Sequence, residues 1–350
     1  MQRFGTGAAL AAMLLILGAG SADAARYRYG GYSGGGQESG VVITVEGGLF
    51  NVRNADHVYA TSESLQVFGG GLNEVTTLIP ASEDDFGGRF GVGYQWANGN
   101  RLTASIGSFS TETSAAADGP LNGALHYAIG PPIALGGGSF AGDSGSPGSF
   151  DLTTETDLTT VDLTFGREHE LGDEFFMEWS AGVRYATYEE TTGGFYDDSV
   201  SNSSTFGDNR YTVDKSLEGD MIGARIAARG NYFLSTSFSL SAGIGLSFLD
   251  GEIVGSSGLT PSGLVNSSTQ PASVSTVDDD GRSGTTAEID VRVTWHGTGD
   301  RLRVWFGWEQ QDWDGIAEDP LRNFPGTAAP LDSRDSIVLS GYRVGASYRF

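Results

Sequence analysis

The last sixteen residues, Asp335 to Phe350, read DSIVLSGYRVGASYRF and decide the fold. Side chains of a strand alternate between its two faces. One face of this stretch is apolar or aromatic and the other is small or basic: Val338, Tyr342, Val344, Ala346, Tyr348 and Phe350 against Gly341, Arg343, Gly345, Ser347 and Arg349. The pattern predicts a membrane strand whose apolar face meets lipid and whose polar face lines the inside of a barrel.

The chain stops at Tyr348-Arg349-Phe350. A final strand of alternating aromatic and small residues that ends in Phe resembles the closing strand of bacterial outer-membrane β-barrels. The resemblance implies that Tyr348 and Phe350 form the assembly signal, and that the barrel-assembly machinery recognises the terminal Phe.

The amino terminus carries a targeting pattern. Residues 1–24 combine Arg3, an apolar run from Ala8 to Gly20 and the small-x-small site Ala22-Asp23-Ala24, which together predict a signal peptide. A membrane anchor is the rival interpretation, but the apolar run is shorter than a spanning helix. Residues 25–40 are rich in Gly and lack periodicity, so they predict a flexible periplasmic lead-in.

The amino-acid composition favours a membrane barrel and excludes several other classes of protein. Glycine accounts for 54 of 350 residues, with 19 Phe, 13 Tyr and 6 Trp, as expected for tapered strands and interfacial aromatic rings. Cysteine is absent, which excludes disulfides, thiolate metal sites and a cysteine nucleophile. The formal net charge of −24 repels phosphate, so nucleic acid is not an expected partner. No apolar run after residue 25 could form a transmembrane helix, so strands must cross any membrane.

Ten segments within 41–350 show the alternation of a membrane strand. They are 41–52, 85–96, 101–110, 158–167, 174–189, 217–232, 236–249, 285–295, 301–313 and 335–350. Long and short connections alternate between them, which predicts an all-β, up-and-down antiparallel transmembrane barrel with short periplasmic turns and long extracellular loops. A hairpin of 58–61 with 65–68 would raise the count to twelve, and eight is the other alternative. In a soluble β-sandwich, the rival fold, the length of a connection would not depend on whether it is odd or even in the order along the chain.

Aromatic residues support the membrane interpretation. Seven of them fall at strand ends beside the short turns, as a periplasmic aromatic girdle requires: Trp96, Phe175, Tyr232, Phe238, Trp295, Tyr348 and Phe350.

The inward faces of the predicted strands carry charge. Strand parity predicts a pore-lining set of Glu46, Arg89, Asp162, Glu178, Arg184, Arg225, Arg229, Glu288, Asp290, Arg292, Arg303, Glu309, Arg343 and Arg349. A charged lumen is either a water channel or a salt-bridged plug. Eight strands enclose only side chains and sixteen or more leave a wide channel, so ten predict a narrow or partly blocked lumen. A one-residue error in register would exchange the lining and lipid faces.

The long connections are acidic. Their carboxylates are Asp56, Glu63, Glu74, Glu83, Asp84, Asp197, Asp198, Asp208, Asp278, Asp279, Asp280, Glu318, Asp319, Asp332 and Asp335. Solvated loops are the plain interpretation. The sharper hypothesis is that they concentrate cations at a pore mouth or hold divalent ions among lipid phosphates. Asp278 to Asp280 is too short a cluster for a calcium site, so neither metal nor cofactor is predicted.

One short motif suggests catalysis. Gly142-Asp143-Ser144-Gly145-Ser146-Pro147 resembles the sequence around the nucleophile of chymotrypsin-like serine proteases. It departs from that family at Ser146, and no His of the chain lies in the family's Ala-Ala-His-Cys context. His57 beside Asp56 could serve an outer-membrane hydrolase, although a lone His is usually a surface residue. We therefore predict no enzyme and no catalytic residue, with a hydrolase as the remote alternative.

Two segments carry a further resemblance. Residues 45–50 and 341–350 look like the opening and closing of the major-outer-membrane-protein-like pore-forming family. This resemblance implies passive diffusion of small solutes or ions through a barrel in the bacterial outer membrane, with lipid, the assembly machinery and the solutes as partners. The alternative function is a non-conducting surface barrel whose acidic loops serve attachment or envelope integrity.

Overall fold

The structure is a computed structural model that describes residues 39–54, 60–64, 74–78, 84–117, 124–127, 148–172, 174–198, 209–261, 274–297, 301–316 and 336–350. No helix in these ranges is long and apolar enough to span a membrane. The predicted signal peptide, His57 and residues 142–147 lie outside the described residues.

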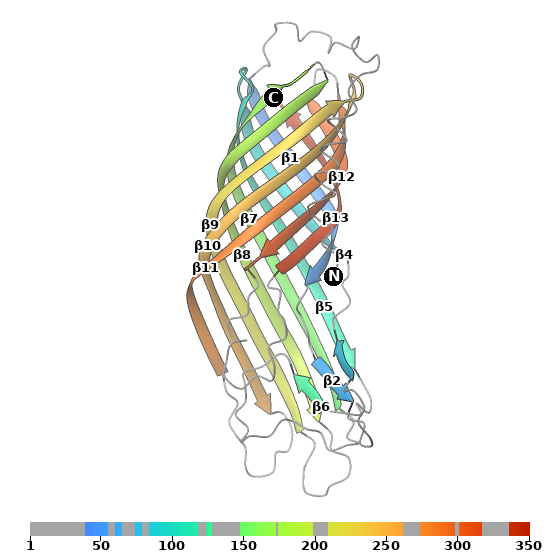
Figure 1. Cartoon of the computed structure of the whole chain (residues 1–350), viewed down its shortest axis with the longest axis vertical. Coiled ribbons are helices and arrows are strands. Elements are labelled where there is room, and N and C mark those ends of the chain that lie inside the picture. The colour runs from blue at the N-terminus through green and yellow to red at the C-terminus, as the bar shows by residue number, and fades with distance from the viewer. Residues whose placement is uncertain are drawn as a thin grey trace, which may run out of the picture.

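Ten strands close into one antiparallel barrel (Figure 1). They are β1 (Gly40–Asn54), β4 (Asp84–Gln95), β5 (Asn100–Ala117), β7 (Gly148–Glu170), β8 (Phe175–Asp198), β9 (Asn209–Phe233), β10 (Phe238–Pro261), β11 (Val274–His296), β12 (Leu302–Asp314) and β13 (Ser336–Arg349). Each strand pairs with the barrel strand before and after it in the chain, and β1 pairs with β13. The predicted ten-stranded up-and-down barrel is therefore confirmed.

The closing pair explains why the terminal stretch decides the fold. β13 pairs with β1 from Val42 opposite Arg349 to Asn54 opposite Ile337, and with β12 along its other edge. The Phe350 N–H donates to the Val41 carbonyl at 2.9 Å. These bonds leave no free edge, so the backbone polar groups of the spanning region are satisfied within the barrel.

Short turns gather at one end of the barrel, together with the C-terminus (Figure 1). They join β4 to β5, β7 to β8, β9 to β10 and β11 to β12. In the first, Gly99 has a φ of 81°, a conformation that Gly adopts without steric cost, and its N–H donates to the Trp96 carbonyl at 3.1 Å. We call this the turn end and the opposite end the loop end.

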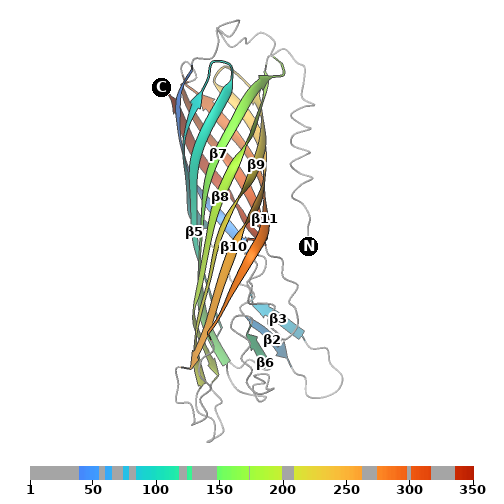
Figure 2. The ribbon, with the colours of Figure 1, turned by 90° about the vertical axis from the view of Figure 1, so that its left-hand side faces the viewer.

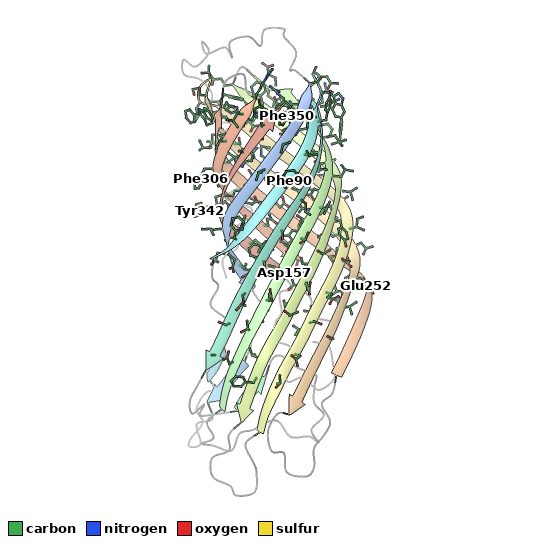
Figure 3. All side chains as sticks on the ribbon, turned by 180° about the vertical axis from the view of Figure 1, so that it is seen from behind. Phe90, Asp157, Glu252, Phe306, Tyr342 and Phe350 are labelled. Atoms are coloured by element: carbon green, nitrogen blue, oxygen red, sulfur yellow. The ribbon has the colours of Figure 1, made fainter. Side chains whose placement is uncertain are left out.

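An apolar band surrounds the barrel near the turn end. Its side chains point away from the barrel, with exposed fractions of 69% for Phe86, 59% for Phe306 and 64% for Tyr342. Figure 3 shows Phe306 and Tyr342 on this outer surface, where their rings stack with centroids 6.0 Å apart. The predicted outward faces are thus confirmed. Five predicted girdle residues are exposed and two are half-buried: Trp96, Phe238, Trp295, Tyr348 and Phe350, then Phe175 and Tyr232.

Six strands reach much further toward the loop end than predicted: β5, β7, β8, β9, β10 and β11. Figure 2 shows them continuing as a curved wall beyond the ends of the shorter strands. Most of the expected connections 190–212 and 250–284, and both ends of 111–151, are therefore strand. The prediction of long loops was wrong for these parts of the chain.

The extra length escaped prediction because the apolar face changes sides. On β10, Leu246 and Phe248 are exposed on the outside, whereas Leu249 and Ile253 are buried on the inside. Asp250, between the last two, is exposed. Beyond the apolar band the wall thus has a water-facing exterior and an apolar interior, which is the reverse of a membrane strand.

A separate small sheet lies beside the barrel wall (Figure 2). It consists of β3 (Glu74–Leu78), β2 (Ala60–Ser64) and β6 (Ala124–Tyr127), in that order. These strands do not join the barrel, so the alternative of a twelve-stranded barrel was wrong.

Several acids expected in loops belong to strands. Asp278 to Asp280 lie in β11, where Asp280 is opposite Glu252. Asp197 and Asp198 end β8, Glu63 and Glu74 belong to the small sheet, and Asp84 begins β4. The remaining predicted loop acids lie outside the described residues: Asp56, Glu83, Asp208, Glu318, Asp319, Asp332 and Asp335.

Candidate functional site

The inner face of the barrel holds all fourteen residues predicted to line the lumen. Seven are buried: Asp162, Arg184, Glu288, Asp290, Glu309, Arg343 and Arg349. The other seven are half-buried: Glu46, Arg89, Glu178, Arg225, Arg229, Arg292 and Arg303. Their outward neighbours along each strand are the exposed apolar residues. Their inward position agrees with strand parity, while a role in lining a pore stays a prediction.

One half of the lumen is crossed by ion pairs centred on Arg184 of β8. Its Nε donates to Asp162 at 2.7 Å, and its Nη1 reaches across the lumen to Glu288 of β11. Arg225 of β9 lies 2.6 Å from Glu288 and 3.7 Å from Asp162. Two arginines therefore share two carboxylates.

The other half centres on Arg343 of β13. Its guanidinium lies 2.7 Å from Glu46 and 3.4 Å from Asp290, and it also pairs with Glu309. Two more arginines complete this half through three ion pairs: Arg229 to Asp290 at 2.9 Å, Arg89 to Glu309 at 3.5 Å and Arg89 to Glu46 at 3.8 Å.

We call these ten residues the charged belt: Glu46, Arg89, Asp162, Arg184, Arg225, Arg229, Glu288, Asp290, Glu309 and Arg343. Five arginines balance five carboxylates. Because a buried charge without a partner is costly, such balance is what allows the belt to lie inside a narrow barrel. The belt narrows the lumen, because ion pairs such as Arg184 to Glu288 join strands on different sides of it.

Glycines on β10 make room for the belt. A Cβ at Gly245 would lie 3.2 Å from both Arg225 Nη2 and Glu288 Oε2, and one at Gly243 would overlap the Asp290 carboxylate. The small inward residues of the predicted strand 236–249 thus accommodate long side chains from neighbouring strands.

An apolar cluster lies inside the barrel between the belt and the loop end. Its members are Val52, Phe109, Leu158, Ala186, Tyr188, Leu217, Met221, Leu249, Ile253, Trp313, Ile316, Ile337 and Leu339, with Phe50 packed against them. Trp313 is fully buried at 0% exposed. This cluster was not predicted, because apolar side chains were expected only on the outward faces. The sequence does contain a sign of the cluster: in these parts of the strands, the apolar residues occupy the inward-facing positions instead of the outward-facing ones.

A polar chamber lies on the other side of the belt, toward the turn end. It is a cavity of about 170 Å³ lined by belt residues and by Arg101, Glu178 and Arg292. Arg101 and Glu178 form an ion pair at 3.9 Å, with side chains 28% and 24% exposed. Arg184 and Arg343 in the belt are only 1% and 4% exposed. Exposure varies within the belt itself, because the side chains of Arg89 and Arg229 are 25% and 28% exposed.

The outside of the extended wall forms a second charged surface. Asp157 of β7, Glu189 of β8 and Glu218 of β9 occupy directly paired positions, and Glu252 of β10 lies opposite Asp220. Figure 3 shows Asp157 and Glu252 on the part of the wall nearer the loop end, apart from the apolar band.

Within the described ranges, no group of His, Cys, Asp and Glu has the arrangement of a metal site.

Comparisons with known proteins place this barrel among bacterial outer-membrane proteins. Residues 49–350 match the sequence model of a family described as Legionella pneumophila major outer membrane protein precursor. A search of curated proteins found no match.

Solved structures of several barrels resemble the chain. The outer membrane protease OmpT from Escherichia coli is 10% identical, with a TM-score of 0.39 and coverage of 89% of this chain and 97% of that one. A major outer membrane protein from Thermus thermophilus is 14% identical, with a TM-score of 0.33 and coverage of 89% and 99%. The toluene transporter TbuX from Ralstonia pickettii is 10% identical, with a TM-score of 0.30 and coverage of 90% and 90%. Likenesses at this level assign neither activity nor substrate.

Proposed function

We propose, from the premise that the chain belongs to the Legionella major outer membrane protein family, that it forms a narrow pore for small solutes or ions. The family and the barrel fold place the protein in the bacterial outer membrane. In the proposal the turn end faces the periplasm, as short turns do in barrels of this membrane. In the proposed mechanism, the conformation described here is closed and the apolar cluster is its gate.

The proposal rests on one observation: the same lumen contains a polar chamber and, beyond the belt, an apolar constriction. The chamber of about 170 Å³ is lined by charged residues and is partly exposed to solvent. Beyond the belt, Leu217, Ile253 and Trp313 are at most 1% exposed. Hydrophobic constrictions can close a channel by excluding water, so separation of the cluster would join the chamber to the extracellular side.

Single-channel recording of the refolded protein tests the proposal. We expect brief or rare openings for the unaltered chain and longer or larger openings for Trp313→Ala, because the substitution removes the largest buried side chain of the cluster. Trp308→Ala is the matched control, since Trp308 lies on the outward face of the same strand. Equal conductance in the two variants would contradict a gate at Trp313.

A second candidate function is a non-conducting surface barrel. It is favoured by the complete pairing of the charged belt, since five arginines and five carboxylates across the lumen also describe a structural plug. Silence of both the unaltered protein and Trp313→Ala in a bilayer, with the barrel correctly folded, would support this candidate over the pore.

A further inference from the structure

Arg292 stands apart from the other lumen arginines around the chamber. It lies on β11 with its side chain on the inner face, and it lines the chamber. Its Nε has no hydrogen-bond partner, and no ion pair to it is found among the described residues. The belt carboxylates are already shared among Arg89, Arg184, Arg225, Arg229 and Arg343. Arg292 therefore adds one positive charge to the charged belt and the Arg101–Glu178 pair, which are balanced without it.

The Arg292 guanidinium is held in place by an aromatic surface. Its central carbon lies 5.2 Å from the centroid of the Trp305 ring on the neighbouring strand β12. Trp305 in turn lies against Gly345 of β13, where a Cβ would come within 2.5 Å of Trp305 Cε2 and Cζ2. Any larger residue at position 345 would displace the ring. The stack restricts the guanidinium without using its N–H donors. Because Nε is buried, the terminal Nη groups are the donors left to meet a ligand.

Two further arginines line the same chamber, Arg101 and Arg229. Each has a buried Nε, so only their terminal guanidinium nitrogens can face the space. A cavity needs a volume of about 10–15 Å³ to hold one water molecule. The chamber of about 170 Å³ therefore admits a small hydrated oxyanion. The planar guanidinium of arginine presents pairs of N–H donors whose spacing matches two oxygens of a carboxylate or a phosphate.

We propose that the chamber binds a small oxyanion, of the carboxylate or phosphate type, through the Arg292 guanidinium on its Trp305 support. In this proposal access is from the turn end, because the chamber residue Arg101 lies at the start of β5 beside a short turn and the apolar cluster lies on the opposite side of the belt. The site requires no opening of the gate. The proposal therefore goes beyond conduction and stands even if the barrel never conducts.

Titration of inorganic phosphate into the refolded protein tests the site, with line broadening in phosphorus NMR as the readout. Chloride replaces phosphate in the reference samples at equal ionic strength. Loss of one charge-assisted contact should weaken binding about tenfold or more in Arg292→Gln. Arg292→Lys keeps the charge but loses the fork, so we expect intermediate affinity and a chamber that still folds.

Arg303→Gln is the matched control. It removes the same charge from the inner face of β12, but Arg303 does not line the chamber. We expect its phosphate affinity to equal that of the unaltered protein. Absence of phosphate binding by the unaltered protein would overturn the proposal. So would equal losses in Arg292→Gln and Arg303→Gln, because a general effect of lumen charge would then explain them.

Discussion

The Arg184 guanidinium lies 5.4 Å from the centroid of the Trp313 ring, so the charged belt and the apolar cluster are in direct contact. A second connection runs along β12, where Trp313 Nε1–H donates to Gln311 Oε1 at 3.0 Å and Gln311 Nε2–H donates to Glu309 at 2.6 Å. The residue that seals the lumen is thus held by groups of the belt. Changes in belt charge are therefore expected to affect both stability and the proposed gate.

Arg184→Met should destabilise the barrel by about 3–5 kcal/mol, because it leaves two buried carboxylates with Arg225 as their remaining shared partner. Urea unfolding in lipid vesicles measures the free energy. Arg167→Met is the control, since Arg167 is exposed on the outer face of β7 and should change stability by less than about 0.5 kcal/mol. Similar losses for the two variants would contradict the structural role given to Arg184.

Gly243→Ala should cost about 1–3 kcal/mol, because the added methyl overlaps the Asp290 carboxylate and must displace its 2.9 Å contact with Arg229. Gly193→Ala on β8 is the matched substitution, and nothing lies within 4 Å of its added methyl. The same unfolding assay compares them. A neutral Gly243→Ala would mean that the belt can rearrange without loss.

Glu189→Gln should stabilise the extended wall by about 0.2–1 kcal/mol, because Glu189 is flanked by Asp157 on β7 and Glu218 on β9 at directly paired positions. The gain should shrink in about 1 M salt, where the Debye length falls to about 3 Å. Thr191→Val changes the same strand without altering charge and should show no such salt dependence. A gain for Glu189→Gln that persists in high salt would have a cause other than charge repulsion.

Phe350→Ala should lower the amount of folded barrel in cells more than it lowers refolding in detergent. The side chain is 68% exposed on the barrel exterior, so few internal contacts are lost, while the terminal aromatic residue is predicted to be an assembly signal. Heat-modifiable migration on gels reports folding in both settings. Val344→Ala, also outward on β13, controls for lost lipid contact. Equal losses in cells and in detergent would point to stability rather than recognition.

Local alternation predicted much of this protein because it depends on one strand at a time. On β13, Tyr342 and Val344 face outward while Arg343 is buried inside, as the sequence pattern requires. The same rule assigned every predicted lumen residue to the inner face and gave the strand number of the barrel. It failed beyond the apolar band, where water replaces lipid outside and the apolar residues turn inward, as Leu249 and Ile253 do.

The contacts within the lumen were decided only by the tertiary structure. Arg343 meets Glu46, which is 297 positions away in the sequence, because β13 closes the barrel against β1 in one register. Arg184 meets Glu288 from across the lumen for the same reason. Alternation determines whether a side chain points inward, but its partners depend on pairing register and on the closing of all ten strands. The sequence alone therefore determined the faces of the barrel, whereas barrel closure decided which charges pair and left Arg292 beside the chamber without an ion partner among the described residues.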